Sequence, residues 1–84
     1  QNRPPVFLAK TMKILSKRVV GKDRSHIKFS LAEMGSDSIW DAIGFGLANK
    51  ANNLADSIDV VYRLKKTTYH KSGHPYELEI LDFI

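Results

Sequence analysis

A chain of 84 residues has room for one domain with a single modest core. Hydrophobic residues at 43% and charged residues at 26% are typical of a folded globular protein and argue against disorder. Thirteen Lys and Arg against nine Asp and Glu give a net charge of +4, which favours an anionic partner such as nucleic acid or a membrane surface. The absence of Cys excludes disulfides, thiolate zinc sites and cysteine nucleophiles.

Residues 1–9, which include Pro4 and Pro5, are expected to form an extended lead-in or linker. Residues 10–84 are then the folded domain, cut from a larger protein. No apolar run approaches the roughly 20 residues that span a bilayer, and no secretion signal opens the chain. We therefore expect a cytoplasmic location and no membrane partner.

Three β-strands are predicted in the first half of the chain. Residues 10–20 are rich in β-formers, but their apolar residues change parity midway, which indicates a β-bulge or a sharp bend before the turn at Gly21. Residues 26–32 alternate cleanly between apolar and polar side chains. Residues 39–46 form the third strand, whose apolar residues in phase are Ile39, Ile43 and Phe45. Asp41 shares this parity, which indicates a bulge or a barrel rim.

The second half of the chain changes period and then returns to strands. One short helix is predicted within residues 47–57, with an apolar stripe of Leu47, Ala51, Leu54 and Ala55. Strands follow over residues 58–69 and 76–83, joined by a long hairpin loop. Five bent strands with a helix between the third and fourth predict a mainly β protein with the OB-fold, a five-stranded Greek-key barrel. An SH3-like barrel is the main structural rival.

Two loops carry basic clusters at the positions that an OB-fold uses for ligands. The first is "GKDRS", continued by His26, Lys28 and Ser30 along the second strand, and the second is "KKTTYHKSGHP". Basic side chains neutralise phosphates, and an aromatic ring can stack on any base. If the fold is correct, both clusters converge on one groove that binds an anion. The alternative is that each cluster is a solvated surface.

Other motifs point less clearly to chemistry. Trp40 is either a core residue or a stacking platform, because its parity opposes that of Ile39. His70 and His74 lack further ligands for a metal, so no metal site is expected. "GFG" at residues 44–46 lacks the third glycine of a dinucleotide-binding loop and indicates strand curvature instead. No catalytic constellation is present in the sequence.

The ordered segments "PPVFLAKTMKILSKRVVGKDRSHIKFSL", "DAIGFG", "IDVVYRL" and "GHPYELEILDF" resemble the OB-fold domain of RecJ, the bacterial exonuclease specific for single-stranded DNA. The residues that match the family's pattern are Pro5, Phe7, Val20, Gly21, Lys22, His26, Ala42, Phe45, Gly46, Leu78, Ile80 and Asp82. The chain departs from the family's last hairpin, where it has Thr67, Tyr69 and a longer loop reaching Gly73. It also has Glu77 in place of a common Gln, and Ser57 in place of a turn glycine.

The resemblance implies a binding module without activity of its own. In RecJ a separate core, with Asp/His motifs that hold Mg²⁺ or Mn²⁺, degrades the strand 5′→3′ in DNA repair and recombination. The chain itself lacks these motifs and needs no cofactor. The expected partners are single-stranded DNA, the remaining domains of the parent exonuclease and single-strand-binding protein. We expect DNA contacts from Lys22, Arg24, His26, Lys28, Arg63, Lys65, Lys71 and the stacking residue Tyr69, with Trp40 as a second stacking candidate.

Two alternatives from another class remain open. OB-fold barrels also bind peptides, and a basic groove suits an acidic peptide. The domain could instead be a spacer that packs on its parent core, which would leave apolar surface at "PPVFL" or "LDFI".

Overall fold

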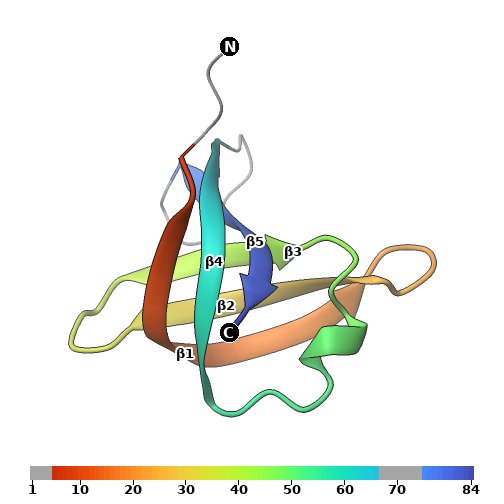
Figure 1. The fold of residues 1–84 in the computed structure, drawn as a ribbon, viewed down its shortest axis with the longest axis horizontal. Helices are drawn as coiled ribbons and strands as arrows, with labels where there is room; N and C mark the ends of the chain where they lie inside the picture. The colour runs from red at the N-terminus through yellow and green to blue at the C-terminus, as the bar shows by residue number, and fades with distance from the viewer. Residues whose placement is uncertain (1–4, 67–74) are drawn as a thin grey trace.

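Five β-strands close into a barrel in the computed structural model, which describes residues 5–66 and 75–84 (Figure 1). Their order around the barrel is β1-β2-β3-β5-β4. All neighbours pair antiparallel except β3 and β5, which pair in parallel at Ala42↔Leu78 and Ile43↔Glu79. The mainly β OB-fold is thereby confirmed. The elements are β1 (Phe7–Val20), β2 (His26–Glu33), β3 (Ile39–Gly44), the 3₁₀ turn η1 (Asn49–Ala51), β4 (Ser57–Lys66) and β5 (Tyr76–Phe83).

Strand β1 bends so strongly that it pairs with β4 through its first half and with β2 through its second. The register shifts between Ala9 and Met12 on the β4 side, and between Ile14 and Ser16 on the β2 side. Thr11 has a positive φ of 58° at the first irregularity, where its N–H donates to Asp59 Oδ1 at 2.8 Å. The bend expected from the change of apolar parity is therefore present.

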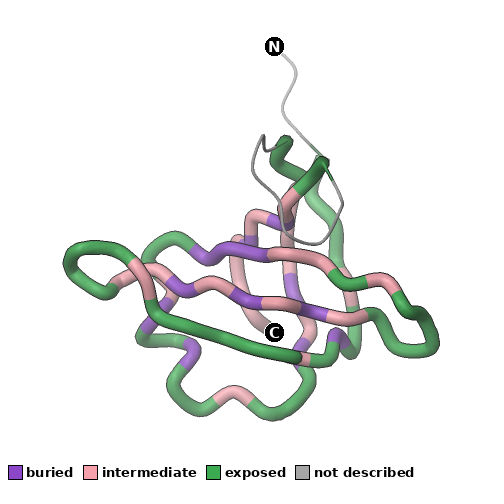
Figure 2. The backbone as a smooth tube through the Cα atoms, turned by 180° about the vertical axis from the view of Figure 1, so that it is seen from behind, coloured by how far each residue is buried: buried purple, intermediate pink, exposed green. Residues whose placement is uncertain are grey.

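The core lies inside the barrel and follows the alternation of β2. Ile27, Phe29 and Leu31 are buried, while the residues between them are only partly covered (Figure 2). Phe29 packs edge-on against Phe83 at a ring-centroid distance of 5.7 Å. The other strands and η1 complete the buried cluster with Met12, Ala42, Ala51, Ile58, Val60, Leu78 and Ile80.

Strand β3 buries side chains of both parities, rather than only the parity that its sequence indicates. Ile43 is buried as expected. Ile39 and Phe45 are 43% and 46% exposed, whereas Trp40 packs against the core and Ala42 is buried. The cause is the register with β2, in which Trp40 pairs with Leu31 and Ala42 pairs with Phe29. Cross-strand partners share a face, so these two residues follow their buried partners inward. The strand also ends at Gly44 rather than at residue 46.

Two other boundaries differ from the expectation. The helix between β3 and β4 is reduced to the 3₁₀ turn Asn49–Ala51, although Ala48 and Ala51 are buried as the apolar stripe suggested. Asn49, Asn52 and Asn53 are weak helix formers, and a segment this short rarely sustains an α-helix. Strand β1 begins at Phe7, opposite Tyr62 of β4, so residues 7–9 of the expected lead-in belong to the barrel. No helix in the described part of the chain is long and apolar enough to cross a membrane.

Leu31→Ala is expected to lower the free energy of unfolding by about 2–5 kcal/mol, because the Leu31 side chain is completely buried. Urea unfolding followed by circular dichroism measures this loss. Met34→Ala is the control, since Met34 is 65% exposed and its truncation should change stability by less than about 0.5 kcal/mol. Equal losses for the two variants would contradict this placement of the core.

Candidate nucleic-acid interface

The turn between β1 and β2 projects from the side of the barrel and is held by its own hydrogen bonds (Figure 1). Gly21 has a φ of 96°, and its carbonyl accepts the Arg24 N–H at 3.2 Å. Asp23 Oδ1 accepts the Ser25 hydroxyl at 2.7 Å and the Ser25 N–H at 3.2 Å. These bonds from Ser25 lower the pKa of the Asp23 carboxyl from its ordinary 3.8. The turn thus presents the exposed side chains of Lys22 and Arg24 from an ordered backbone.

His26, which begins β2, joins this turn to the end of β3. Its Nδ1 accepts the Gly46 N–H at 2.9 Å, and the Ala48 N–H donates to the neighbouring Ser25 carbonyl at 3.0 Å. Because Nδ1 is an acceptor in the first bond, the proton of the neutral ring sits on Nε2. A Cβ added to Gly21 would lie 2.9 Å from His26 Cδ2, so only glycine leaves room for the ring.

Beyond the turn, the outer face of β1 and β2 carries further cations. The pairing Val20↔His26 sets Arg18 opposite Lys28 and Ser16 opposite Ser30. A depression crosses this face onto β3 and β5, and its polar lining consists of Ser16, Lys17, Arg18, Lys28, Ser30, Asp41 and Glu77. Arg18 is absent from the set expected from the sequence. The register of the hairpin could have predicted Arg18, because a turn over residues 21–25 pairs position 18 with position 28.

Two other expected cations on β4 already have partners. The Arg63 guanidinium contacts the Glu79 carboxylate through two bonds, Nε to Oε1 at 3.3 Å and Nη2 to Oε2 at 3.4 Å. Lys65 Nζ lies over the Phe45 ring, 5.1 Å from its centroid. The Arg63–Glu79 pair is locally neutral, so Arg63 is less suited to hold a phosphate than the cations of the turn.

Phe45 is the aromatic residue that the sequence analysis missed. It lies between β3 and η1, where its ring packs edge-on with His26 at 5.4 Å and is still 46% exposed. Its parity with Ile43 suggested a core position, but β3 ends one residue earlier. No local signal reveals this, because the end of the strand depends on its pairing with β2.

Of the two expected stacking residues, Trp40 lies within the described part of the chain and Tyr69 does not. Trp40 is partly buried, packs against the core and donates from Nε1 to Glu33 Oε1 at 3.3 Å. This placement favours the core alternative for Trp40. Tyr69 and Lys71, together with His70 and His74, lie outside the described residues.

Charge is divided across the outer face. The cations gather on the β1–β2 hairpin, and the acids Asp41, Glu77 and Glu79 lie on β3 and β5. Within residues 5–66 and 75–84, no group of three or more His, Asp or Glu side chains could hold a metal ion. The face can therefore attract an anion along the hairpin, next to an exposed ring.

The sequence profile of one family, described as the RecJ OB domain, matches residues 1–81. The chain belongs to this family. No curated protein and no solved structure matches the chain.

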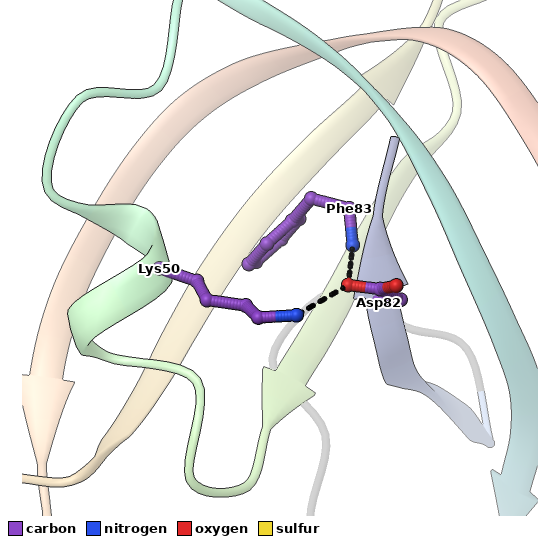
Figure 3. A network of polar contacts seen from close by, with 3 residues as sticks. All are labelled: Lys50, Asp82 and Phe83. Atoms are coloured by element: carbon purple, nitrogen blue, oxygen red, sulfur yellow. Dashed lines mark hydrogen bonds and ion pairs between the residues drawn. The ribbon is translucent and has the colours of Figure 1, made fainter.

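Several residues that carry the likeness to the RecJ OB domain serve its architecture. Asp82 accepts Lys50 Nζ at 3.0 Å and the Phe83 N–H at 2.9 Å, which ties η1 to the end of β5 (Figure 3). The Lys50 hydrogen bond and charge, together with the Phe83 N–H, lower the pKa of the Asp82 carboxyl from its ordinary 3.8. Gly21 and His26 likewise belong to the joint between the turn and β3.

Gly21→Ala is expected to destabilise the RecJ OB domain by about 1–2 kcal/mol through its left-handed backbone, and by more because the new methyl group displaces His26. Thermal unfolding measures the loss, and the imidazole resonances of His26 should shift. Gly35→Ala is a matched control, since Gly35 also has a positive φ of 78° but open space around its Cβ position. If both variants lose the same stability and leave His26 unshifted, the contact between Gly21 and His26 is unimportant.

Proposed function

We propose that this RecJ OB domain is a single-stranded-DNA-binding module. One observation carries the proposal: the β1–β2 turn carries exposed cations, and hydrogen bonds from residues 46 and 48 connect this turn to the segment that carries an exposed aromatic ring. Cations that follow a sugar–phosphate backbone, together with a ring for the bases, are the usual means of binding a single strand. Phosphate contacts and stacking carry little sequence information, so base preference should be weak.

The division of charge favours one strand over a duplex. A duplex presents two rows of phosphates, and a protein that follows both needs a broad cationic surface. Here the cations that line the depression, Lys17, Arg18 and Lys28, lie on the β1–β2 hairpin, and Asp41 and Glu77 lie across the same depression. A single strand can follow the hairpin without passing over these carboxylates. We place its phosphates on Lys22, Arg24, Lys28 and the added Arg18, with His26 Nε2–H as a further donor.

In the parent protein, this module would hold the strand for a separate core that degrades DNA 5′→3′ with Mg²⁺ or Mn²⁺ in the cytoplasm. The domain contributes binding and no chemistry. Its partners would be the remaining domains of that exonuclease and single-strand-binding protein, in repair and recombination. The proposal also keeps three DNA contacts from the expected set. Lys65 lies near the end of β4, and Tyr69 and Lys71 follow β4 in the sequence.

Replacing both Lys22 and Arg24 by Ala should weaken the binding of an oligothymidylate and reduce its dependence on salt. Each lost phosphate contact on a single strand flattens the slope of log affinity against log salt by about 0.7, so two contacts give about 1.4. Fluorescence anisotropy at four or five salt concentrations measures the slope. Stability should change by less than about 0.5 kcal/mol, because both side chains are exposed.

The matched control replaces Lys10 and Lys13, which are exposed on the first half of β1, away from the hairpin turn. It removes the same two charges from the net charge of +4. Equal flattening by both double variants would mean that net charge alone governs binding. Binding by the unaltered domain that ignores salt, or that prefers duplex, would overturn the proposed function.

A second candidate function is protein binding, and a different surface favours it. An apolar hollow of about 350 Å³ opens between β1, β3, β4 and β5, lined in part by Met12, Trp40, Tyr62, Leu64 and Leu78. Phe7 extends the apolar surface by contacting Tyr62 at a ring-centroid distance of 5.6 Å. Lys10 and Glu33 border the hollow. An acidic peptide with an apolar anchor, or a neighbouring domain of the parent, could occupy it.

Chemical-shift mapping by NMR separates the two functions. The chain has a single Trp, so the Trp40 indole N–H gives one reporter inside the apolar hollow. An oligothymidylate should shift the amides of residues 21–28 and leave the indole signal in place. An acidic peptide that carries a Phe should shift the indole signal if the hollow binds protein. If the peptide alone shifts residues 21–28, the DNA-binding proposal fails.

A further inference from the structure

The joint between the β1–β2 turn and the end of β3 holds Phe45 beside the cationic turn. The Gly46 N–H is bound to His26 Nδ1 at 2.9 Å, and the Ala48 N–H is bound to the Ser25 carbonyl at 3.0 Å. Phe45 immediately precedes these two anchored positions, and its ring also packs on His26. The ring is therefore held next to His26, at the base of the turn that carries Lys22 and Arg24.

The surroundings of Phe45 are unusual for a large apolar side chain. The ring is 46% exposed; it packs edge-on with the ring of His26, and Lys65 Nζ lies 5.1 Å from its centroid. Gly44 and Gly46 flank it in the sequence, so neither adjacent residue adds a side chain that could cover the ring. Because the ring is exposed and its neighbours are an imidazole and an ammonium group, Phe45 contributes little to the packing of the core.

We infer that Phe45 is the platform on which the domain stacks one nucleobase, while the β1–β2 turn holds that nucleotide's phosphate. The inference rests on the proposed function and adds a site residue to it. A cation–π contact at an exposed site is weaker than the stacking of a base on an aromatic ring. An incoming base can therefore replace Lys65, whose freed ammonium becomes available to a phosphate.

A nucleobase also suits the site better than an aliphatic or peptide side chain. Base and phosphate are covalently joined, so one nucleotide can satisfy both the ring and the cationic turn. Every base offers a π-face, which agrees with binding that tolerates any sequence. His26 keeps its Nε2–H for a base or phosphate oxygen, because its Nδ1 is occupied by Gly46.

The test compares an oligothymidylate with an abasic oligonucleotide of the same length, which keeps the phosphates and lacks the bases. The unaltered domain should bind the thymidylate more tightly. Phe45→Leu should weaken thymidylate binding roughly 5- to 100-fold, as expected for the loss of one stacked base. It should not weaken abasic binding, and it should leave the salt slope for the thymidylate unchanged, because no phosphate contact is lost. Phe45→Tyr should restore the affinity for thymidylate.

Phe7→Leu is the matched control, since Phe7 is a 40% exposed aromatic residue on the first half of β1. It should bind both oligonucleotides like the unaltered domain. If Phe45→Leu weakens both ligands equally, Phe45 only supports the turn and the stacking role is wrong. If Phe45→Leu keeps the full preference for thymidylate, the base stacks elsewhere and the proposed function survives without this site. If the unaltered domain binds neither ligand, the proposed function and this inference both fail.

Discussion

The barrel depends on one constraint: a single strand, β1, must pair with two different neighbours. Strand β1 must pair with β4 and then with β2, which lie on different sides of the barrel. A straight strand of 14 residues could not do this, because five strands close only around a strongly curved sheet. The left-handed backbone of Thr11 provides the first irregularity, and Asp59 stabilises it by accepting the freed N–H. Asp59 thus has an architectural role.

The bend of β1 also decides where the candidate interface can be. Because the second half of β1 leaves β4, its hairpin with β2 projects from the barrel and exposes its turn (Figure 1). His26 then ties that turn to the segment after β3, and Gly21 leaves the room that the His26 ring needs. The cations of the turn and the ring of Phe45 are consequently two parts of one surface, although about 20 residues separate them in the chain. A ligand that contacts both would meet an ordered site.

Ion pairs on this domain set its charge pattern more than its stability. Exposed or half-exposed pairs such as Lys50–Asp82 and Arg63–Glu79 contribute little to stability, because solvent and salt screen the attraction. Their effect is to neutralise Lys50 on η1 and Arg63 on β4. Lys22, Arg24 and the other cations of the β1–β2 hairpin keep their charge, so the hairpin remains positive beside the acids of β3 and β5. This asymmetry is what orients a single strand in the proposed function.

The sequence determined the strands whose two faces differ. The alternation of residues 26–32 predicted the buried face of β2 correctly, and the parity change in residues 10–20 predicted the bend of β1. The turn at Gly21 could also be predicted, because a glycine between two strands often has a positive φ. These features depend on neighbouring positions in the chain, so local patterns are sufficient to predict them.

Only the tertiary structure decided which side chains of "IWDAIGFG" are buried and that Phe45 is exposed. This segment has large apolar residues at both parities, so its own pattern cannot say which face is buried. Pairing with Leu31 and Phe29 turns Trp40 and Ala42 inward and leaves Ile39 outside, and Phe45 is exposed because β3 ends at Gly44. The same holds for Arg63, which its own sequence presents as a free cation until the register of β4 with β5 sets Glu79 opposite it. Register is a property of two strands together, and for that reason neither strand's sequence contains it.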